Sequence, residues 1–382
     1  MNYLSLLLAG LAAVAVFFLL RKKRDPAAPI PPVERKASPA PLTAPASVPI
    51  EAPAKPNLRP IVRPAGPQIN ARLKNFSPTR SVDLPSEDAE AIMAMLSRIP
   101  RPPHALHKLV SPEFLAEANT AQLSEMVIAE PQVAAKVLVT VNSPYYGLKA
   151  PLGSIGQAVT FLGMNTVRGI CLQYMLGESF RTSDPEIKRV FDRLWNASAF
   201  ASELCFKLAQ LLQLPEPGTL VTQVVLSFLG PVASHSLLRR ELVLSMSGAG
   251  LLERSLLEQE HLGLCAAEIG SLLMQSWKLP QSIIDNVRDI DLVLVTPPAM
   301  VTGQRASRMA FCYVCARLGE KLAQGDVTDL AAYDLEQEPG PEYFHLQSYL
   351  KRPELARLTE FIHLPELVSS INTMVQSMQI RR

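Results

Sequence analysis

The sequence predicts an all-α protein in which a transmembrane helix and a proline-rich linker precede a non-bundle helical domain with a helical C-terminal extension. From about residue 88 onward, apolar residues recur at helical spacing, and the alternation typical of strands is scarce. Residues 4–20 are apolar except for Ser5, and 15 of the 61 residues from 25 to 85 are proline. We therefore divide the chain into an anchor (1–24), a linker (25–87), a helical domain (88–290) and the extension (291–382).

The N-terminal segment has the pattern of a retained membrane anchor. As a helix its 17 residues would span roughly 25 Å, a little less than a hydrocarbon core of about 30 Å. The basic run Arg21–Arg24 follows the apolar residues, whereas a cleaved signal peptide carries its positive charge before them. The positive-inside rule then predicts a single-pass protein of the inner (cytoplasmic) membrane with its C-terminal domain in the cytoplasm.

Small residues at four-residue spacing in this segment, Ser5, Ala9 and Ala13, would allow self-association through one helix face. The alternative is that alanine is simply common in such segments. The linker that follows cannot bury enough apolar surface to offset its chain entropy, so we expect it to be a disordered tether.

Charge is divided unevenly along the chain. Residues 21–85 carry twelve Lys/Arg and four Asp/Glu, a net of +8, whereas the whole chain carries +2, which leaves about −6 for residues 86–382. A basic stem suits anionic lipid headgroups. The acidic folded part argues against nucleic-acid binding.

Capping residues mark the helix boundaries in the first part of the domain. Asn119 and Gln122 form a capping box, and Pro131 suits the first turn of a helix that buries Val133, Val137 and Val141. Asn142 should end that helix, because Ser143 precedes a proline and so avoids the helical region.

The remaining helices follow in order. Ser154 and Gln157 cap a short helix that ends at Gly163, and Asn165 opens the next one. A long helix begins at about Pro185, and another, after Pro297-Pro298, contains Cys312. The chain ends with helices that bear four apolar residues at helical spacing, Leu367, Ile371, Met374 and Met378.

The cysteines do not form a recognisable site. The chain has five, an odd number that suits a reducing compartment. Cys312 and Cys315 form a CxxC, but they lie inside an apolar-periodic helix rather than at the helix start after a strand that a redox pair prefers, and no second pair of zinc ligands follows. No P-loop and no GxSxG motif is present.

Several segments resemble the HDOD domain family, helical relatives of HD-type metal phosphohydrolases. The resemblance covers roughly residues 88–290 and rests on residues 130–138, Asn142-Ser143, Ser154-Ile155, Ala158-Val159, Leu162-Gly163, Leu194-Trp195 with Ser198, Glu268-Ile269-Gly270 and Trp277-Lys278-Leu279-Pro280. The family-signature positions with a structural role are Pro131, Gly163, Trp195, Gly270, Trp277 and Pro280.

The resemblance also implies that the metal site is missing. The positions that hold the first His, the His-Asp doublet and a third His in the hydrolases fall on Ala197, Gly230-Pro231 and Ala266, and the late Asp falls near Ser307. We therefore expect no catalytic residue, no metal and no cofactor. Restoring His and Asp at 230 and 231 should be tolerated without reviving chemistry, because two ligands seldom hold a catalytic metal.

Proline should also shape this region. Because a proline inside a helix costs about 3 kcal/mol, the helix through Val224 and Phe228 should end or kink at Pro231, with Leu229 or Val232 partly filling the space. None of the six histidines precedes an Asp, and only His235 and His261 lie near the vestigial site.

The best candidates for ligand or partner contact are Asn142, Ser143, Tyr145 and Tyr146. The alternative, which we favour for Asn142, is that its amide bonds backbone groups in the turn. Trp195 and Trp277 are expected to be core anchors.

The resemblance implies a membrane-tethered, catalytically inactive signalling protein of a bacterial regulatory system. It would act by binding a signalling protein or a nucleotide messenger such as a cyclic dinucleotide. Two alternatives stay open: a divergent HD-type phosphohydrolase or phosphodiesterase with unusual ligands, and a structural inner-membrane scaffold.

Overall fold

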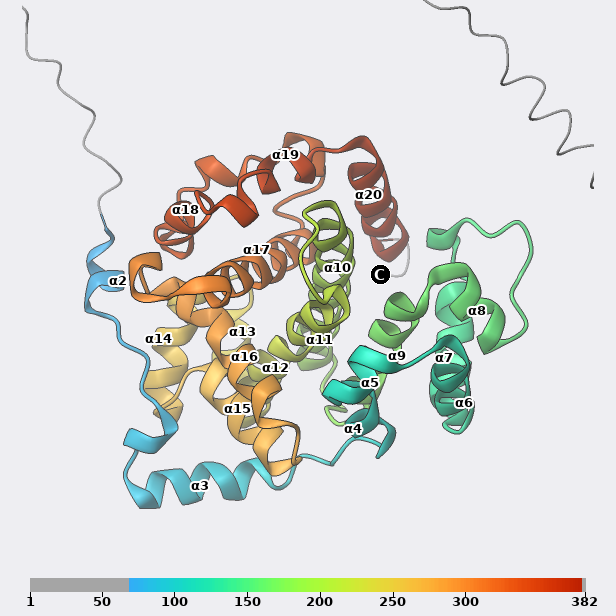
Figure 1. Ribbon diagram of the computed structural model, residues 1–382. Helices are drawn as coiled ribbons and strands as arrows, with labels where there is room; N and C mark the ends of the chain where they lie inside the picture. The colour runs from blue at the N-terminus through green and yellow to red at the C-terminus, as the bar shows by residue number, and fades with distance from the viewer. Residues whose placement is uncertain (1–68, 380–382) are drawn as a thin grey trace, which may run out of the picture. The chain divides into compact units, whose positions relative to one another are not determined.

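The computed structural model describes residues 69–379, and this part of the chain contains helices and no strand. Figure 1 gives the helix labels. The α-helices are α2 (Ala71–Asn75), α3 (Ser86–Leu96), α4 (Ala105–Val110), α5 (Pro112–Glu117), α6 (Thr120–Ile128), α7 (Pro131–Val141), α8 (Ile155–Leu162), α9 (Met164–Glu178), α10 (Pro185–Leu211), α11 (Pro217–Ser227), α12 (Leu229–Leu237), α13 (Arg240–Met246), α14 (Leu251–Leu262), α15 (Ala266–Ser276), α16 (Gln281–Asp291), α17 (Gly303–Gln324), α18 (Leu346–Tyr349), α19 (Leu358–Ile362) and α20 (Pro365–Gln379). Single 3₁₀ turns are η1 (Ser81–Asp83), η2 (Pro144–Tyr146), η3 (Leu292–Leu294), η4 (Pro298–Met300), η5 (Leu330–Ala332), η6 (Leu335–Gln337), η7 (Pro341–Tyr343) and η8 (Pro353–Leu355).

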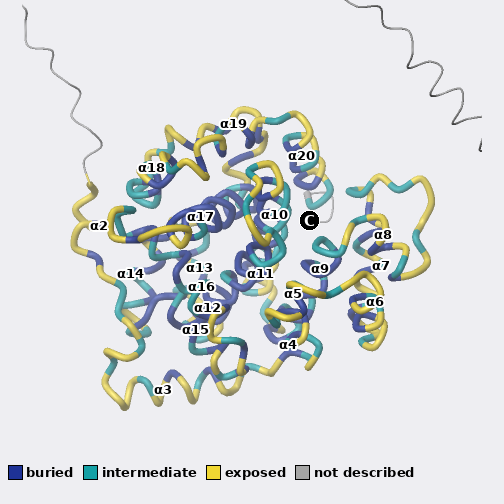
Figure 2. Tube along the Cα trace, in the orientation of Figure 1, coloured by how far each residue is buried: buried dark blue, intermediate teal, exposed yellow. Residues whose placement is uncertain are grey.

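The long helices α10 and α17 pack along each other and form the centre of the fold (Figure 1). Helices α11, α12 and α16 pack next to them, and α15 packs against α12 and α16. Helices α4 to α9 form a separate group that joins the centre through α9. The buried residues concentrate in α10, α11, α12 and α17 (Figure 2). This is the non-bundle all-α fold that the helical periodicity predicts.

The predicted helix boundaries are confirmed where a capping residue marks them. Asn119 and Gln122 form both hydrogen bonds of a capping box, and the Ser154 hydroxyl accepts from the Gln157 backbone amide. Gly163, at φ 83°, is both the C-cap of α8 and the N-cap of α9, so α9 begins at Met164, one residue before the predicted Asn165. Its positive φ explains the glycine.

The predicted break near Pro231 is present, but it lies three residues earlier. Helix α11 ends at Ser227 and α12 begins at Leu229, which places Pro231 in the first turn of α12. Amides in a first turn have no partner within their own helix, so the proline costs α12 no hydrogen bond. Leu229 and Val232 are fully buried, as expected.

The folded region begins earlier than residue 88, which corrects the predicted extent of the linker. Residues 71–75 form α2, and Leu73 and Phe76 are buried. The Thr79 amide donates to the Gln259 side chain, and the Ser81 amide donates to Glu268. The segment therefore lies on α14 and α15, because two buried apolar side chains and these hydrogen bonds hold it there.

The predicted membrane anchor, with Ser5, Ala9 and Ala13, lies outside the described residues. Within residues 69–379, only the stretch Pro217–Leu237 has the length and hydropathy of a membrane span. It comprises α11 and α12, and 83% of its most apolar window is buried inside the fold. We interpret it as core.

The region after residue 290 is more than an extension, because α17 is a central helix of the fold. It carries Cys312 and Cys315, both fully buried and both free. Burial raises the pKa of the Cys312 thiol well above its ordinary value. A buried, free cysteine pair inside a helix is a packing element, as its sequence context predicts.

Candidate functional site

Two of the predicted metal-ligand positions touch each other through their backbones. A Cβ atom placed on Gly230 of α12 would lie 2.3 Å from the carbonyl oxygen of Ala266, the first residue of α15. A Cβ on Gly270, one turn further along α15, would lie 2.8 Å from the Cα of Gly230. Helices α12 and α15 therefore cross at their smallest residues, and their backbones fill the space between them.

At Ala197, another predicted metal-ligand position, two helix backbones again lie in close contact. Ala197 of α10 is 1% exposed, and its carbonyl oxygen would lie 2.5 Å from a Cβ on Gly319 of α17. Ser307, the predicted position of the late Asp, donates to Glu354 and accepts from Arg352, both of them in or beside η8. Across residues 69–379, no three His, Cys, Asp or Glu side chains converge as a metal site requires.

The contact at Gly230 contradicts the expectation that a restored His-Asp doublet would be tolerated. Any side chain at residue 230 would overlap the Ala266 carbonyl, and a backbone atom cannot move aside as a flexible side chain can. The sequence did not predict this crossing of α12 and α15, because it joins segments that are far apart along the chain.

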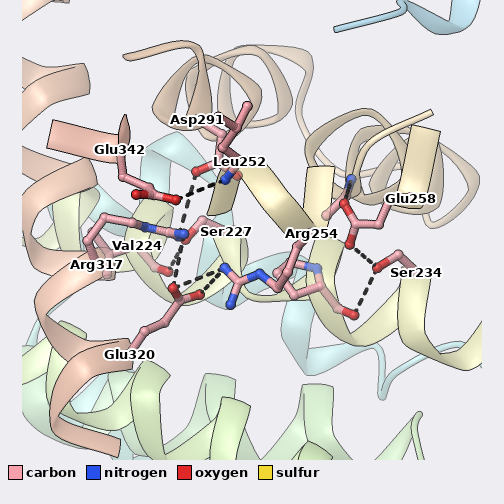
Figure 3. Close-up of polar contacts among 12 residues, drawn as sticks. Val224, Ser227, Ser234, Leu252, Arg254, Glu258, Asp291, Arg317, Glu320 and Glu342 are labelled. Atoms are coloured by element: carbon pink, nitrogen blue, oxygen red, sulfur yellow. Dashed lines mark hydrogen bonds and ion pairs between the residues drawn. The ribbon is translucent and has the colours of Figure 1, made fainter. Parts of the chain in front are cut away.

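A buried ion network lies beside this crossing, and Figure 3 shows its members. Arg254 of α14 donates to both carboxylate oxygens of Glu320, at 2.8 and 3.0 Å. Arg317 lies 3.0 Å from Glu320 and 3.7 Å from Asp291, the last residue of α16. Although burial acts to raise it, the two arginines hold the pKa of Glu320 below its ordinary value. The network therefore joins α14, α16 and α17.

A second buried carboxyl, Glu258, joins α14 to α12 and α15. It accepts from the Ser234 hydroxyl at 2.7 Å and from the Ala266 amide at 2.8 Å (Figure 3). Burial raises its pKa to about 7, against the lowering effect of these hydrogen bonds. Glu258 thus holds the first turn of α15 against α12, next to the Gly230 contact.

The two histidines near the vestigial site do not line an open cleft. His261 is exposed on α14, whereas His235 is 4% exposed, and neither of its ring nitrogens has a hydrogen-bond partner among the described residues. Burial, together with the nearby Arg254, lowers the pKa of His235 to about 4. A neutral, enclosed imidazole of this kind is part of the core.

A cleft of about 880 Å³ lies elsewhere, between α7, η2, α9, α10 and α20. Three of the four predicted contact residues, Ser143, Tyr145 and Tyr146, line it. Asn142 does not. Its amide donates to the Leu152 carbonyl at 3.0 Å and accepts from the Leu152 amide at 2.7 Å, which is the structural role that we favoured.

One end of the cleft holds a tyrosine pair. The rings of Tyr145 and Tyr146 meet edge to face at 4.6 Å, and the Tyr145 hydroxyl lies 3.1 Å from Ser370 of α20. Burial and the neighbouring Glu203 carboxylate raise the pKa of both tyrosines. Both hydroxyls therefore stay protonated. Glu203 faces them from α10 with 15% of its side chain exposed, and it also pairs with Lys207 at 3.4 Å.

The other charged groups are spread along the cleft face of α10. Arg189 lies near the start of the helix and is exposed, as is Lys136 on α7, and neither makes an ion pair within residues 69–379. Asp192, by contrast, pairs with Lys188, and Arg193 donates to Ser247 at 2.8 Å. Two cations that line the cleft, Arg189 and Lys136, are thus without an ionic partner among the described residues.

The two tryptophans differ in role. Trp277 is 2% exposed and packs against Phe180, as predicted for a core anchor. Trp195 is only half-buried and lines the cleft, with one edge against Gly177. Pro131 lies in the first turn of α7, Gly270 lies at the α12–α15 crossing, and Pro280 is the N-cap of α16.

The sequence did not predict the cleft as a whole, because its walls come from distant segments. Met374, Ser377 and Met378 of α20 complete it, more than two hundred residues after Tyr146. A signal was available in α10, where polar and aromatic cleft residues recur every three or four positions opposite the core face that carries Ala197.

Comparisons with known proteins agree with this fold. The family model of the HDOD domain matches residues 99–291. No curated protein sequence matches the chain.

Among solved structures, an HDOD domain protein of unknown function from Geobacter sulfurreducens is similar with a TM-score of 0.52 and 16% identity, over 75% of this chain and 98% of that chain. A Shewanella amazonensis protein described provisionally as a phosphohydrolase is similar with a TM-score of 0.50 and 18% identity, over 75% of this chain and 98% of that chain. A Marinobacter aquaeolei protein described provisionally as a signal transduction protein is similar with a TM-score of 0.52 and 18% identity, over 80% of this chain and 68% of that chain. At these identities the similarity shows the fold alone.

Proposed function

The chain belongs to the HDOD domain family, and from that premise we propose that it is a non-catalytic signalling or regulatory protein that acts by binding. In this proposal the ligand or partner is received in the cleft between α7, α9, α10 and α20. Residues 1–24 would hold the protein at the inner membrane, with the folded region in the cytoplasm.

The observation that carries the proposal is the crossing of α12 and α15 at Gly230 and Ala266. A hydrolytic metal site needs several ligands and an open position for water. Here the positions equivalent to those ligands carry no ligating side chain, and their backbones lie in direct contact. Opening a site would require the two helices to separate.

The cleft supports the binding part of the proposal. It is concave, mixes aromatic with polar side chains, and has the volume of a typical small-molecule site. Its polar groups include two cations without an ionic partner within the described chain, an arrangement that favours an external ligand.

Metal content and hydrolytic activity test the proposal directly. The full-length chain, purified in detergent without chelator, should contain well under one Mn, Fe, Zn or Mg per chain by elemental analysis. It should hydrolyse phosphomono- and phosphodiester substrates no faster than buffer. About one metal per chain, together with activity that a chelator abolishes, would instead establish the divergent phosphohydrolase.

A further inference from the structure

We infer that the cleft binds a nucleoside polyphosphate with a guanine base, its base beside Glu203 and its phosphates beside Arg189. This inference rests on the proposed binding function and deepens it. It is drawn from the order in which charged, aromatic and amide side chains follow one another along the cleft.

The order is set by α10. Its cleft face begins with Arg189 and with Asp192, whose charge Lys188 balances, continues through Trp195 and Asn196, and ends with Glu203 and Phe206. At about 1.5 Å per residue, the fourteen residues from Arg189 to Glu203 rise roughly 21 Å. The cleft thus has a cationic end, an aromatic middle and a carboxylate end, so its ligand should be elongated, anionic at one end and rich in N–H groups at the other.

The carboxylate end suits a purine. Tyr145, Tyr146 and Phe206 offer aromatic surface there, and bases stack on such surfaces by about 1–3 kcal/mol each. The Glu203 carboxylate is mostly shielded from solvent and pairs through one oxygen with Lys207 at 3.4 Å, which leaves its other oxygen to accept hydrogen bonds from a ligand. Guanine presents two adjacent N–H groups on its Watson–Crick edge, whereas adenine presents one amino group beside an acceptor. Glu203 therefore favours guanine over adenine.

The cationic end suits phosphate. Arg189 lies at this end of α10, Lys136 lines the α7 wall of the cleft, and neither makes an ion pair in the part of the chain that the structure describes. Charge-assisted hydrogen bonds from Arg and Lys to phosphate are among the stronger polar contacts. Because Arg189 lies several helical turns from Glu203, a triphosphate should reach it and a monophosphate should not.

The fluorescence of Trp195 should report ligand binding directly, because Trp195 lines the cleft. The only other tryptophan, Trp277, is 2% exposed in the core. We would titrate the full-length chain in detergent with GTP, GMP, ATP and inorganic phosphate, and follow tryptophan fluorescence and calorimetric heat. GTP should quench the tryptophan fluorescence saturably, and it should bind at least tenfold more tightly than GMP or ATP. Inorganic phosphate should leave Trp195 unchanged, and Trp195→Phe should abolish the quench.

Three variants separate the two ends of the site. Arg189→Ala should weaken the binding of GTP about three- to tenfold and leave the binding of GMP unchanged, because only the longer ligand reaches Arg189. Glu203→Gln should weaken the binding of GTP and of GMP by about tenfold and remove the preference for GTP over ATP. Lys149→Ala removes an exposed cation outside the cleft and should change nothing.

The outcomes distinguish this inference from the function on which it rests. Absence of GTP binding at millimolar concentration, equal binding of ATP, or a quench that Arg189→Ala and Glu203→Gln leave intact would overturn the inference alone. Hydrolysis of GTP in the same samples, lost on chelation, would overturn the non-catalytic function as well.

Discussion

Gly230→Ala tests whether close helix packing has replaced the metal site. Alanine is ordinarily the better helix residue, by about 1 kcal/mol. At residue 230 its Cβ would lie 2.3 Å from the Ala266 carbonyl oxygen, whereas ordinary contacts begin at 3.4 Å. One helix would have to move by about 1 Å, and overpacking of this kind costs about 1–3 kcal/mol. We expect a net loss of up to about 2 kcal/mol.

Gly169→Ala is the matched control. Gly169 is also buried inside a helix, α9, but its Cβ would lie 3.9 Å from Val221, an ordinary contact. The control variant should therefore gain about 0.5–1 kcal/mol from helix propensity.

Urea unfolding of the full-length chain, followed by fluorescence of its two tryptophans, measures both effects. The two midpoints should move in opposite directions. If Gly230→Ala is as stable as Gly169→Ala, the backbone contact is not tight, and space for a metal would have to be reconsidered.

Three further predictions concern other parts of the molecule. Asn142→Leu should cost about 1–2 kcal/mol, because it removes both hydrogen bonds to Leu152; a variant that melts like the parent but loses its ligand would make Asn142 a contact residue. Glu258 has a folded pKa of about 7, above its ordinary 4.5, so its carboxyl should destabilise the parent progressively as pH rises through this window, by up to roughly 3 kcal/mol. Glu258→Gln stays neutral, so its urea midpoint should rise relative to the parent between about pH 5 and 8, and a constant difference would contradict the buried-carboxyl account. Deleting residues 1–24 should give a soluble protein with the parent's circular dichroism spectrum, and a deletion variant that still sediments with membranes would place the anchor elsewhere.

Helix boundaries could be predicted from the sequence because caps are local. Asn119 and Gln122 are three residues apart, and Gly163 follows directly on the helix that it ends. A residue spacing of this kind determines which atoms meet, whatever the rest of the fold does.

Contacts between distant segments could not be predicted in this way. Arg254 and Glu320 are 66 residues apart, and each lies in a helix where a charged residue would ordinarily face solvent. The aromatic residues and amides of α10 likewise gave no sign that α20 would cover them. Only the packing of α14 against α17, and of α20 against α10, brings these side chains together.

In the proposed non-catalytic function, the missing metal ligand and the tight helix contact have one cause. Glycine at residue 230 offers no ligating side chain, and it has no Cβ to keep α12 and α15 apart. Once α12 and α15 lie in contact, Glu258 can bond the Ser234 hydroxyl and the Ala266 amide across the junction. These hydrogen bonds stabilise the close approach, and the overlap at residue 230 then opposes any return of a side chain there. On this proposal, α12 and α15 would have to separate before any metal could bind between residues 230 and 266.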